Sequence, residues 1–341
     1  MAIPFHGTQA TLAGGPGHSV WFTSLISSDA PVEVAPDTTM EGTTNETFFG
    51  YFNSSGSPVL VSHDLQLPFQ KPTQPVPQLV ESGLDAEGNF WSLQDHGLER
   101  TSPTGTVTEF PTGIPHPREE HVIGGPEGDL WFTTEERVAG IGRVTPSGHV
   151  TIVSDGISGQ AGQTSGLAFG SEGRLWFTTG SGRVGSLSPT GPPRVKLVSS
   201  PHKAVIGLSI ARGTGGDLWS IEGRPTRYLV RITPAGQATR MCKVNAIELV
   251  SGIDGNVWFL LANETGHSVS GVGHIDPHGN VTEYHFGHRG LGTPIPGPEG
   301  DVWLTAFPEL TPAQERPGTV IPPSKILRIS PHERSTRVCR A

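Results

Sequence analysis

The sequence predicts an all-β chain that folds as one seven-bladed β-propeller with four antiparallel strands in each blade. Each of the seven tryptophans follows a Gly-containing turn, and from the second onward they recur roughly every 40 to 45 residues, a spacing typical of propeller blades. A second turn, usually of the type Pro-x-Gly, follows each of them, and helical periodicity is absent. The tryptophans are Trp21, Trp91, Trp131, Trp176, Trp219, Trp258 and Trp303.

Residues 119–153 show the expected elements of one blade. An inner strand precedes the turn 124–129, and a second strand runs through Trp131. A third strand ends at the turn 145–148, and an outer strand covers 149–153. Because Gly and Pro fall at these regular positions along the chain, they are expected to form turns.

The first and last blades break the period, while residues 1–341 are expected to form a single domain. Extra residues at about 24–46 in blade 1 and 307–323 in blade 7 fall between the second and third strands. These two blades are neighbours at the ring closure, so the insertions would form a lid over one sector or a surface decoration. Either residues 335–339 or the N-terminal residues supply the last outer strand.

Composition limits the partners and the compartment. The net charge of −9 disfavours nucleic acid and anionic membranes as partners, and no apolar run is long enough to span a membrane. The N-terminal residues show no secretory signal, which favours a cytoplasmic protein. Two cysteines, Cys242 and Cys339, are expected to be reduced there. We also expect a monomer.

The repeat, clearest in residues 118–150 and 252–284, resembles that of the virginiamycin B lyase (streptogramin B lyase) family of seven-bladed propellers. The resemblance implies opening of a cyclic depsipeptide by elimination, over the central cavity and with Mg²⁺. It implies a His on one blade, a Glu-x-His at the start of the next inner strand, and a Glu four residues after that blade's Trp. In the family these residues occupy the last two blades.

This chain departs from the family pattern in those two blades. Blade 7 has residues 292–295 before its Trp and Phe307 after it, and blade 6 has residues 246–248, which include no His. The departure weighs against streptogramin lyase activity, since the fold alone does not give function.

Blade 3 reproduces the second half of the pattern. Glu119 and His121 precede Trp131, and Glu135 lies four residues after it. The resemblance implies that His121 is the general base and that Glu119 and Glu135 are Mg²⁺ ligands or orienting carboxylates. A base that removes a proton from carbon, beside a cation that stabilises the enolate, is suited to elimination. The alternative is that these residues are relics of the repeat.

Five further ionisable residues are candidates for substrate binding. Glu81 and Glu248 lie near the starts of inner strands, Asp95 and His96 follow the second strand of blade 2, and His116 lies in the next connection. Such groups crowded at a channel mouth would shift each other's pKa values, as functional sites often do.

Three functions follow as hypotheses. The first is an enzyme that performs elimination, isomerisation or cyclisation on a mid-sized natural product, a small-molecule or cyclic peptide-like substrate held over the channel. The second is a non-enzymatic propeller that binds a peptide or small molecule. The third is a cyclase that acts by shape, with Phe48, Phe49, Phe69 and Phe307 near the lid.

Overall fold

The structure, a computed structural model, is all-β in the part of the chain that it describes. Its helical residues there are two single 3₁₀ turns, Ser171–Gly173 and Thr214–Gly216. The described residues are 2–3, 9–14, 20–26, 32–35, 38–40, 46–52, 58–63, 83–84, 89–94, 97–102, 106–111, 121–125, 127–134, 140–154, 157, 164–179, 183–188, 196–199, 206–223, 226–252, 254–263, 269–286, 290–297, 300–307, 325–330 and 336–338.

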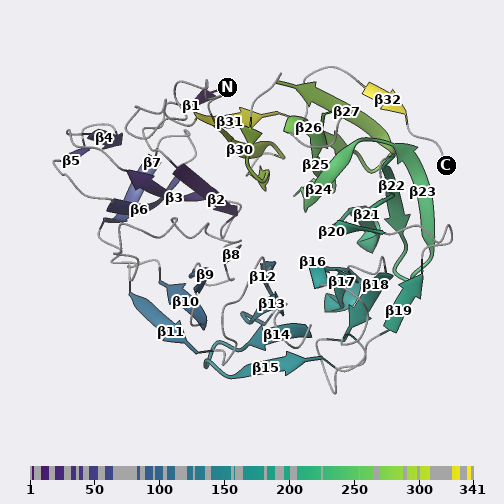
Figure 1. Cartoon of the computed structure of the whole chain (residues 1–341), viewed down its shortest axis with the longest axis horizontal. Coiled ribbons are helices and arrows are strands. Elements are labelled where there is room, and N and C mark those ends of the chain that lie inside the picture. Colours follow the sequence, from purple (N-terminus) through teal and green to yellow (C-terminus); the bar gives the residue numbers. More distant parts are fainter. Residues whose placement is uncertain are drawn as a thin grey trace.

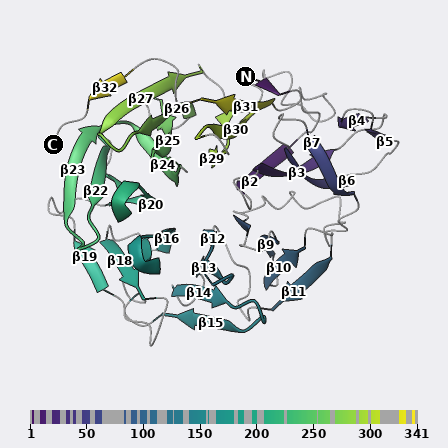
Figure 2. The same cartoon turned by 180° about the vertical axis from the view of Figure 1, so that it is seen from behind.

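Four-stranded antiparallel sheets follow one another along the chain and stand side by side in a ring, with the first strand of each nearest the centre (Figure 1). Figure 2 shows the same ring from behind. This architecture is consistent with a β-propeller. The first sheets comprise β2 (Gln9–Gly14), β3 (Val20–Ile26), β6 (Glu46–Phe52) and β7 (Pro58–His63); β8 (Gly83–Leu84), β9 (Phe90–Gln94), β10 (Gly97–Thr101) and β11 (Val107–Phe110); and β12 (Val122–Gly124), β13 (Leu130–Thr134), β14 (Gly140–Val144) and β15 (Val150–Val153).

The later sheets repeat the plan. They comprise β16 (Thr164–Phe169), β17 (Leu175–Thr179), β18 (Arg183–Leu187) and β19 (Lys196–Ser199); β20 (Ile206–Arg212), β21 (Leu218–Glu222), β22 (Tyr228–Ile232) and β23 (Ala238–Lys243); β24 (Ala246–Ser251), β25 (Val257–Ala262), β26 (Val269–Ile275) and β27 (Asn280–His285); and β28 (Gly290–Leu291), β29 (Ile295–Pro296), β30 (Val302–Phe307) and β31 (Lys325–Ile329).

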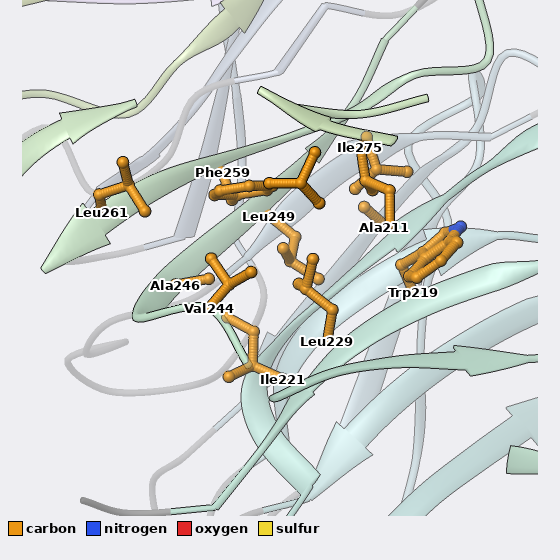
Figure 3. Close-up of a cluster of buried hydrophobic side chains, with 12 residues drawn as sticks. Ala211, Trp219, Ile221, Leu229, Val244, Ala246, Leu249, Phe259, Leu261 and Ile275 are labelled. Carbon is orange, nitrogen blue, oxygen red and sulfur yellow. The ribbon is translucent and has the colours of Figure 1, made fainter. Parts of the chain in front are cut away.

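The repeated tryptophans build the core between sheets. Each lies on the strand that pairs with the inner strand of its sheet, as the sequence predicts, and Trp91, Trp131, Trp176, Trp219, Trp258 and Trp303 are buried. One cluster, drawn in Figure 3, joins the β20–β23 sheet to the β24–β27 sheet through Trp219, Leu229, Phe259 and Ile275. Burial of such large apolar side chains between neighbours holds the repeats together.

A buried aspartate in the turn before the second strand contacts the tryptophan of that strand and an arginine on the third strand. The Asp129 carboxylate is 1% exposed; it accepts a hydrogen bond from Trp131 Nε1 at 2.9 Å and forms an ion pair with Arg143. The Arg143 guanidinium lies over the Trp131 ring, 5.3 Å from its centroid. Asp217 with Arg231 and Asp301 with Arg328 repeat the ion pair. These charged residues therefore belong to the architecture.

In one sheet both members of this pair are replaced. The β24–β27 sheet has Asn256 at the aspartate position and His274 at the arginine position. His274 is 5% exposed and packs against both Trp258 and Tyr284, with ring centroids at 4.6 and 6.2 Å. Aromatic packing takes the place of the ion pair there.

Replacing Asp129 by alanine is expected to lower the free energy of unfolding by about 2 kcal/mol, because it removes two hydrogen-bonding contacts of a buried carboxylate. Asp217→Ala is the matched control, and a smaller loss is expected because the Arg231 side chain is 47% exposed. Urea denaturation measures both. Equal losses would show that burial of the pair is unimportant.

Closure of the ring uses both chain ends. β1 (Ala2–Ile3) pairs with β31 as the outermost strand of the last sheet, with Ala2 opposite Leu327 and Ile3 opposite Ile326. β32 (Thr336–Val338) instead pairs with β27 of the preceding sheet. Of the two routes left open by the sequence, the N-terminal residues supply the last outer strand, and residues 336–338 add a fifth strand next door.

The first insertion contains a hairpin of its own. β4 (Val32–Ala35) and β5 (Thr38–Met40) pair with each other between β3 and β6. In Figures 1 and 2 this hairpin projects from the outer edge of the ring, away from its centre. Residues 24–26 of the expected insertion instead extend β3, since Ser24 pairs with Phe48. Of the second insertion, Phe307 ends β30 and residues 308–323 lie outside the described residues.

The expected reduced state of the cysteines is wrong for Cys242, which is disulfide-bonded. A count of cysteines cannot show which distant strands the fold brings together.

Among the described residues, no helix has the length and apolar character needed to cross a membrane.

Candidate functional site

The register of four sheets defines one equivalent position that lies on the inner strand or directly before it. Val122 pairs with Phe132, Leu167 with Phe177, Ile210 with Ser220 and Leu249 with Phe259, each partner directly following the tryptophan. The residue before the first member of each pair is therefore equivalent from sheet to sheet, and we call it the rim position. It is occupied by His121, Gly166, Ser209 and Glu248.

His121 holds the rim position in front of β12, an innermost strand of the ring (Figure 1). Its backbone N–H donates to Thr133 Oγ1 at 3.0 Å, and its carbonyl accepts from the Thr133 N–H at 3.0 Å. Thr133 is fully buried in β13, whereas His121 is half-buried. The backbone of His121 is therefore fixed to the second strand, β13, while His121 remains partly exposed to solvent.

Ser209 shows what the rim position does in a sheet where the side chain is small. Its hydroxyl donates to the Leu249 carbonyl at 3.2 Å and accepts from the Leu249 N–H at 2.9 Å, which links β20 to β24. The Ser209 carbonyl also accepts from Ser220 Oγ at 2.9 Å. The rim position thus lies at the seam between adjacent inner strands, and its role in this sheet is structural.

Glu248 occupies the rim position of β24. A register shift between Ala246 and Glu248 makes the strand irregular just before it, and Glu248 is half-buried. The β16–β19 and β20–β23 sheets separate it from His121 along the ring (Figure 1). The structure therefore places both predicted residues on the innermost strands without making them neighbours.

The other predicted site residues lie outside the described residues. These are Glu81, Asp95, His96, His116, Glu119 and Glu135. In the part of the chain that is described, no group of three His, Cys, Asp or Glu residues could hold a metal ion. Because both predicted Mg²⁺ ligands, Glu119 and Glu135, fall beyond that part, the metal site stays a prediction.

Sequence reasoning missed a buried ion pair in the β20–β23 sheet. Glu222 ends β21 with no exposed surface, and its Oε2 accepts from Arg240 Nε at 2.8 Å. This hydrogen bond raises the pKa of the Arg240 guanidinium, which also lies 4.3 Å from the centroid of the Tyr228 ring. The pair connects the second and fourth strands across β22 and contributes to the fold. In the sequence, Arg224 is a nearer basic residue, and nothing local points to Arg240.

Comparison with known proteins gives a likeness of fold. No family model matches the sequence, and no curated protein matches it. A streptogramin B lyase structure is similar with a TM-score of 0.59 at 20% identity, covering 89% of this chain and 92% of that one. A catalytically inactive virginiamycin B lyase from Staphylococcus aureus, with quinupristin, has a TM-score of 0.64 at 17% identity over 90% of this chain and 95% of its own.

A structure of a different protein is also similar. YCF48 bound to D1 peptide has a TM-score of 0.58 at 10% identity and covers 98% of this chain and 96% of that one. Identities this low leave the chemistry to be argued from the residues. The resemblance expected from the repeat is confirmed as a likeness of fold: the chain is similar to the virginiamycin B lyase propellers over nine-tenths of its length.

Proposed function

We propose that this chain is a diverged virginiamycin B lyase-like enzyme that performs proton-transfer chemistry on a mid-sized natural product bound over the ring centre. The observation that carries the proposal is His121, a half-buried histidine whose backbone is fixed at the rim of an innermost strand by Thr133. The fold that holds His121 in this position is similar to that of a virginiamycin B lyase with quinupristin.

The propeller of the proposal has seven blades. One Trp-centred sheet corresponds to each of the seven sequence repeats, and β1 completes the sheet of the last repeat next to that of the first. The lyases to which the chain is similar are covered almost end to end, which supports an equal number of blades.

His121 acts as the general base in this proposal. A neutral imidazole can take a proton from a carbon acid, and a backbone held on both sides by a buried residue limits how far that imidazole can move. Glu119 and Glu135 would hold Mg²⁺ or orient the base. Bound Mg²⁺ would supply positive charge to an enolate oxygen.

Substrate contacts in this proposal come from Glu248 at the rim position and from acidic and His residues in the connections around it. Glu248 and Glu81 would lie on inner strands, and Asp95, His96 and His116 would belong to the sector beside His121. A ring of such groups suits a substrate with several amide and hydroxyl groups, such as a cyclic peptide-like molecule.

The elimination has a distinctive balance of atoms. The base removes a proton from the carbon beside a carbonyl group, and the electron pair left behind forms a C=C bond as the adjacent C–O bond breaks. The departing carboxylate stays attached to the opened ring. The product therefore has the same mass as the substrate, whereas hydrolysis would add one water.

The test is to incubate the protein with a panel of cyclic depsipeptides, quinupristin among them, and to separate the products by chromatography with mass detection. We expect a product of unchanged mass from at least one ring other than quinupristin, and none with His121→Asn. An isomeric product that persists in the variant would refute the role of His121. A panel left intact would favour the binding function below.

A non-enzymatic binding propeller is the second candidate. The likeness to YCF48 with a bound peptide favours it, as does the loss of the family pattern in the last two blades. A ligand held in this way would raise the melting temperature, through mass action, without being changed itself. An equal rise for the wild type and for His121→Asn would support binding alone.

A further inference from the structure

We infer that Cys242 and Cys339 form a disulfide that clasps the C-terminal segment across the outer edges of two neighbouring sheets and that the folded protein resides in an oxidising compartment. Cys242, on the outer strand β23, is disulfide-bonded. The sequence contains two cysteines, so Cys339 is the partner that the chain itself offers. Cys339 lies outside the described residues.

The path of the C-terminal segment supports this pairing. After β31 of the last sheet the chain turns back, and β32 pairs along the outer edge of β27 (Figure 1). Thr336 lies opposite Thr282, Arg337 opposite Val281 and Val338 opposite Asn280. Val338, which directly precedes Cys339 in the sequence, therefore lies at the outer edge of β27, in the sheet next to the one that contains β23.

Cys242 and the strand β27, which pairs with β32, contact the same buried cluster. Cys242 is half-buried and packs, with Met241, against the core between the β20–β23 and β24–β27 sheets, part of which is drawn in Figure 3. Val281 of β27 belongs to that core and is 1% exposed. Residues directly opposite each other share a face of the sheet, and so do alternate residues of one strand. Continuing the register of β32 by one residue would thus bring position 339 to the face of Val281.

The bond would close a loop that contains every strand from β24 to β32. It would hold the last two sheets against β23 by a covalent link. Among the described residues, the N-terminal part of the ring closure consists of the two pairs that join Ala2 and Ile3 of β1 to β31. A disulfide that closes a long loop stabilises the folded state mainly by restricting the unfolded chain.

The compartment follows from the same bond. Disulfides persist in secreted, periplasmic or lumenal proteins and are rare in the cytosol, where thiols are kept reduced. The expectation of a cytoplasmic protein rested on the N-terminal residues and on reduced cysteines, and Cys242 removes the second of these grounds.

The pairing is tested first on the unmodified protein. The full chain, prepared without reductant, is alkylated in denaturant and digested, and the peptides are analysed by mass spectrometry. We expect one cross-linked pair that contains Cys242 and Cys339, with no alkylated cysteine. Alkylated Cys242, or a bond from Cys242 to a second copy of the chain or to a small thiol, would overturn the assignment.

The contribution of the disulfide to stability is tested by thermal melting with and without dithiothreitol. Reductant is expected to lower the melting temperature of the wild type by about 5 °C, the shift that loop-closure entropy gives for a chain of this size. The double variant Cys242→Ser/Cys339→Ser is expected to melt at the lower temperature and to ignore reductant. An unchanged wild type, or an equal shift in the double variant, would contradict the clasp; if the variant does not fold, the wild-type melts decide.

Discussion

Replacement of His121 by asparagine is expected to reduce kcat/KM at least a hundredfold for the substrate that the depsipeptide panel identifies. A positioned general base contributes roughly 10²- to 10⁴-fold, and asparagine keeps the polarity and approximate size of the side chain without its basicity. The backbone contacts of His121 to Thr133 do not depend on the side chain, so the rim should keep its shape. Steady-state kinetics that follow the formation of the ring-opened product measure the effect, and a melting curve checks that the variant is folded.

Two control variants separate catalysis from architecture. Ser209→Ala changes the same rim position in another sheet and removes the bridge from Ser209 to Leu249, so it should lower the melting temperature and leave turnover intact. Thr133→Val removes the acceptor for the His121 N–H and should lower kcat with little change in KM, because Thr133 is a positioning residue. If Ser209→Ala reduced turnover as strongly as His121→Asn, the rim position would be structural throughout.

The fold was predictable because its determinants are local. A tryptophan on the second strand, the turns on either side of it and the absence of helical spacing all recur within one repeat. Gly128 and Gly148 have φ of 74° and 84°, a backbone conformation that favours glycine, which is why the two turns of a repeat can be read from the sequence. Ring closure could not be read in this way, because the two residues of β1 are too few to show any periodicity.

For the candidate site, the sequence predicts where residues lie along the strands but not which side chains contact each other. Spacing from the tryptophan placed His121 and Glu248 near the starts of inner strands, and they lie directly before β12 and on β24. It could not show that Ser209, at the same position, joins two sheets. Nor could it pair Glu222 with Arg240, because a register shift in β23 decides which of its residues face β21.

Replacement of Gly142 by alanine is expected to lower the free energy of unfolding by about 3 kcal/mol or more, the upper part of the range for overpacked cores. Gly142 on β14 lies opposite Phe132 on β13, and an added Cβ would overlap the far carbons of the Phe132 ring. That ring is fully buried, in a cluster with Trp91 and Leu98 of the neighbouring sheet, so it cannot move aside without opening the contact between sheets.

Gly290 provides the matched control for Gly142, since it also lies opposite a phenylalanine, Phe307. At Gly290 the nearest atom to an added Cβ is Phe307 Cβ at 3.5 Å, an ordinary contact, and the glycine is exposed. Gly290→Ala is therefore expected to change the free energy of unfolding by less than about 1 kcal/mol, with the lower entropy of the unfolded chain acting in its favour. Chemical denaturation of both variants tests the comparison, and Phe132→Leu in the Gly142→Ala background should recover part of the loss. A Gly142→Ala variant as stable as Gly290→Ala would show that the sheet interface can yield, and that the glycine opposite the buried phenylalanine is not required for this packing.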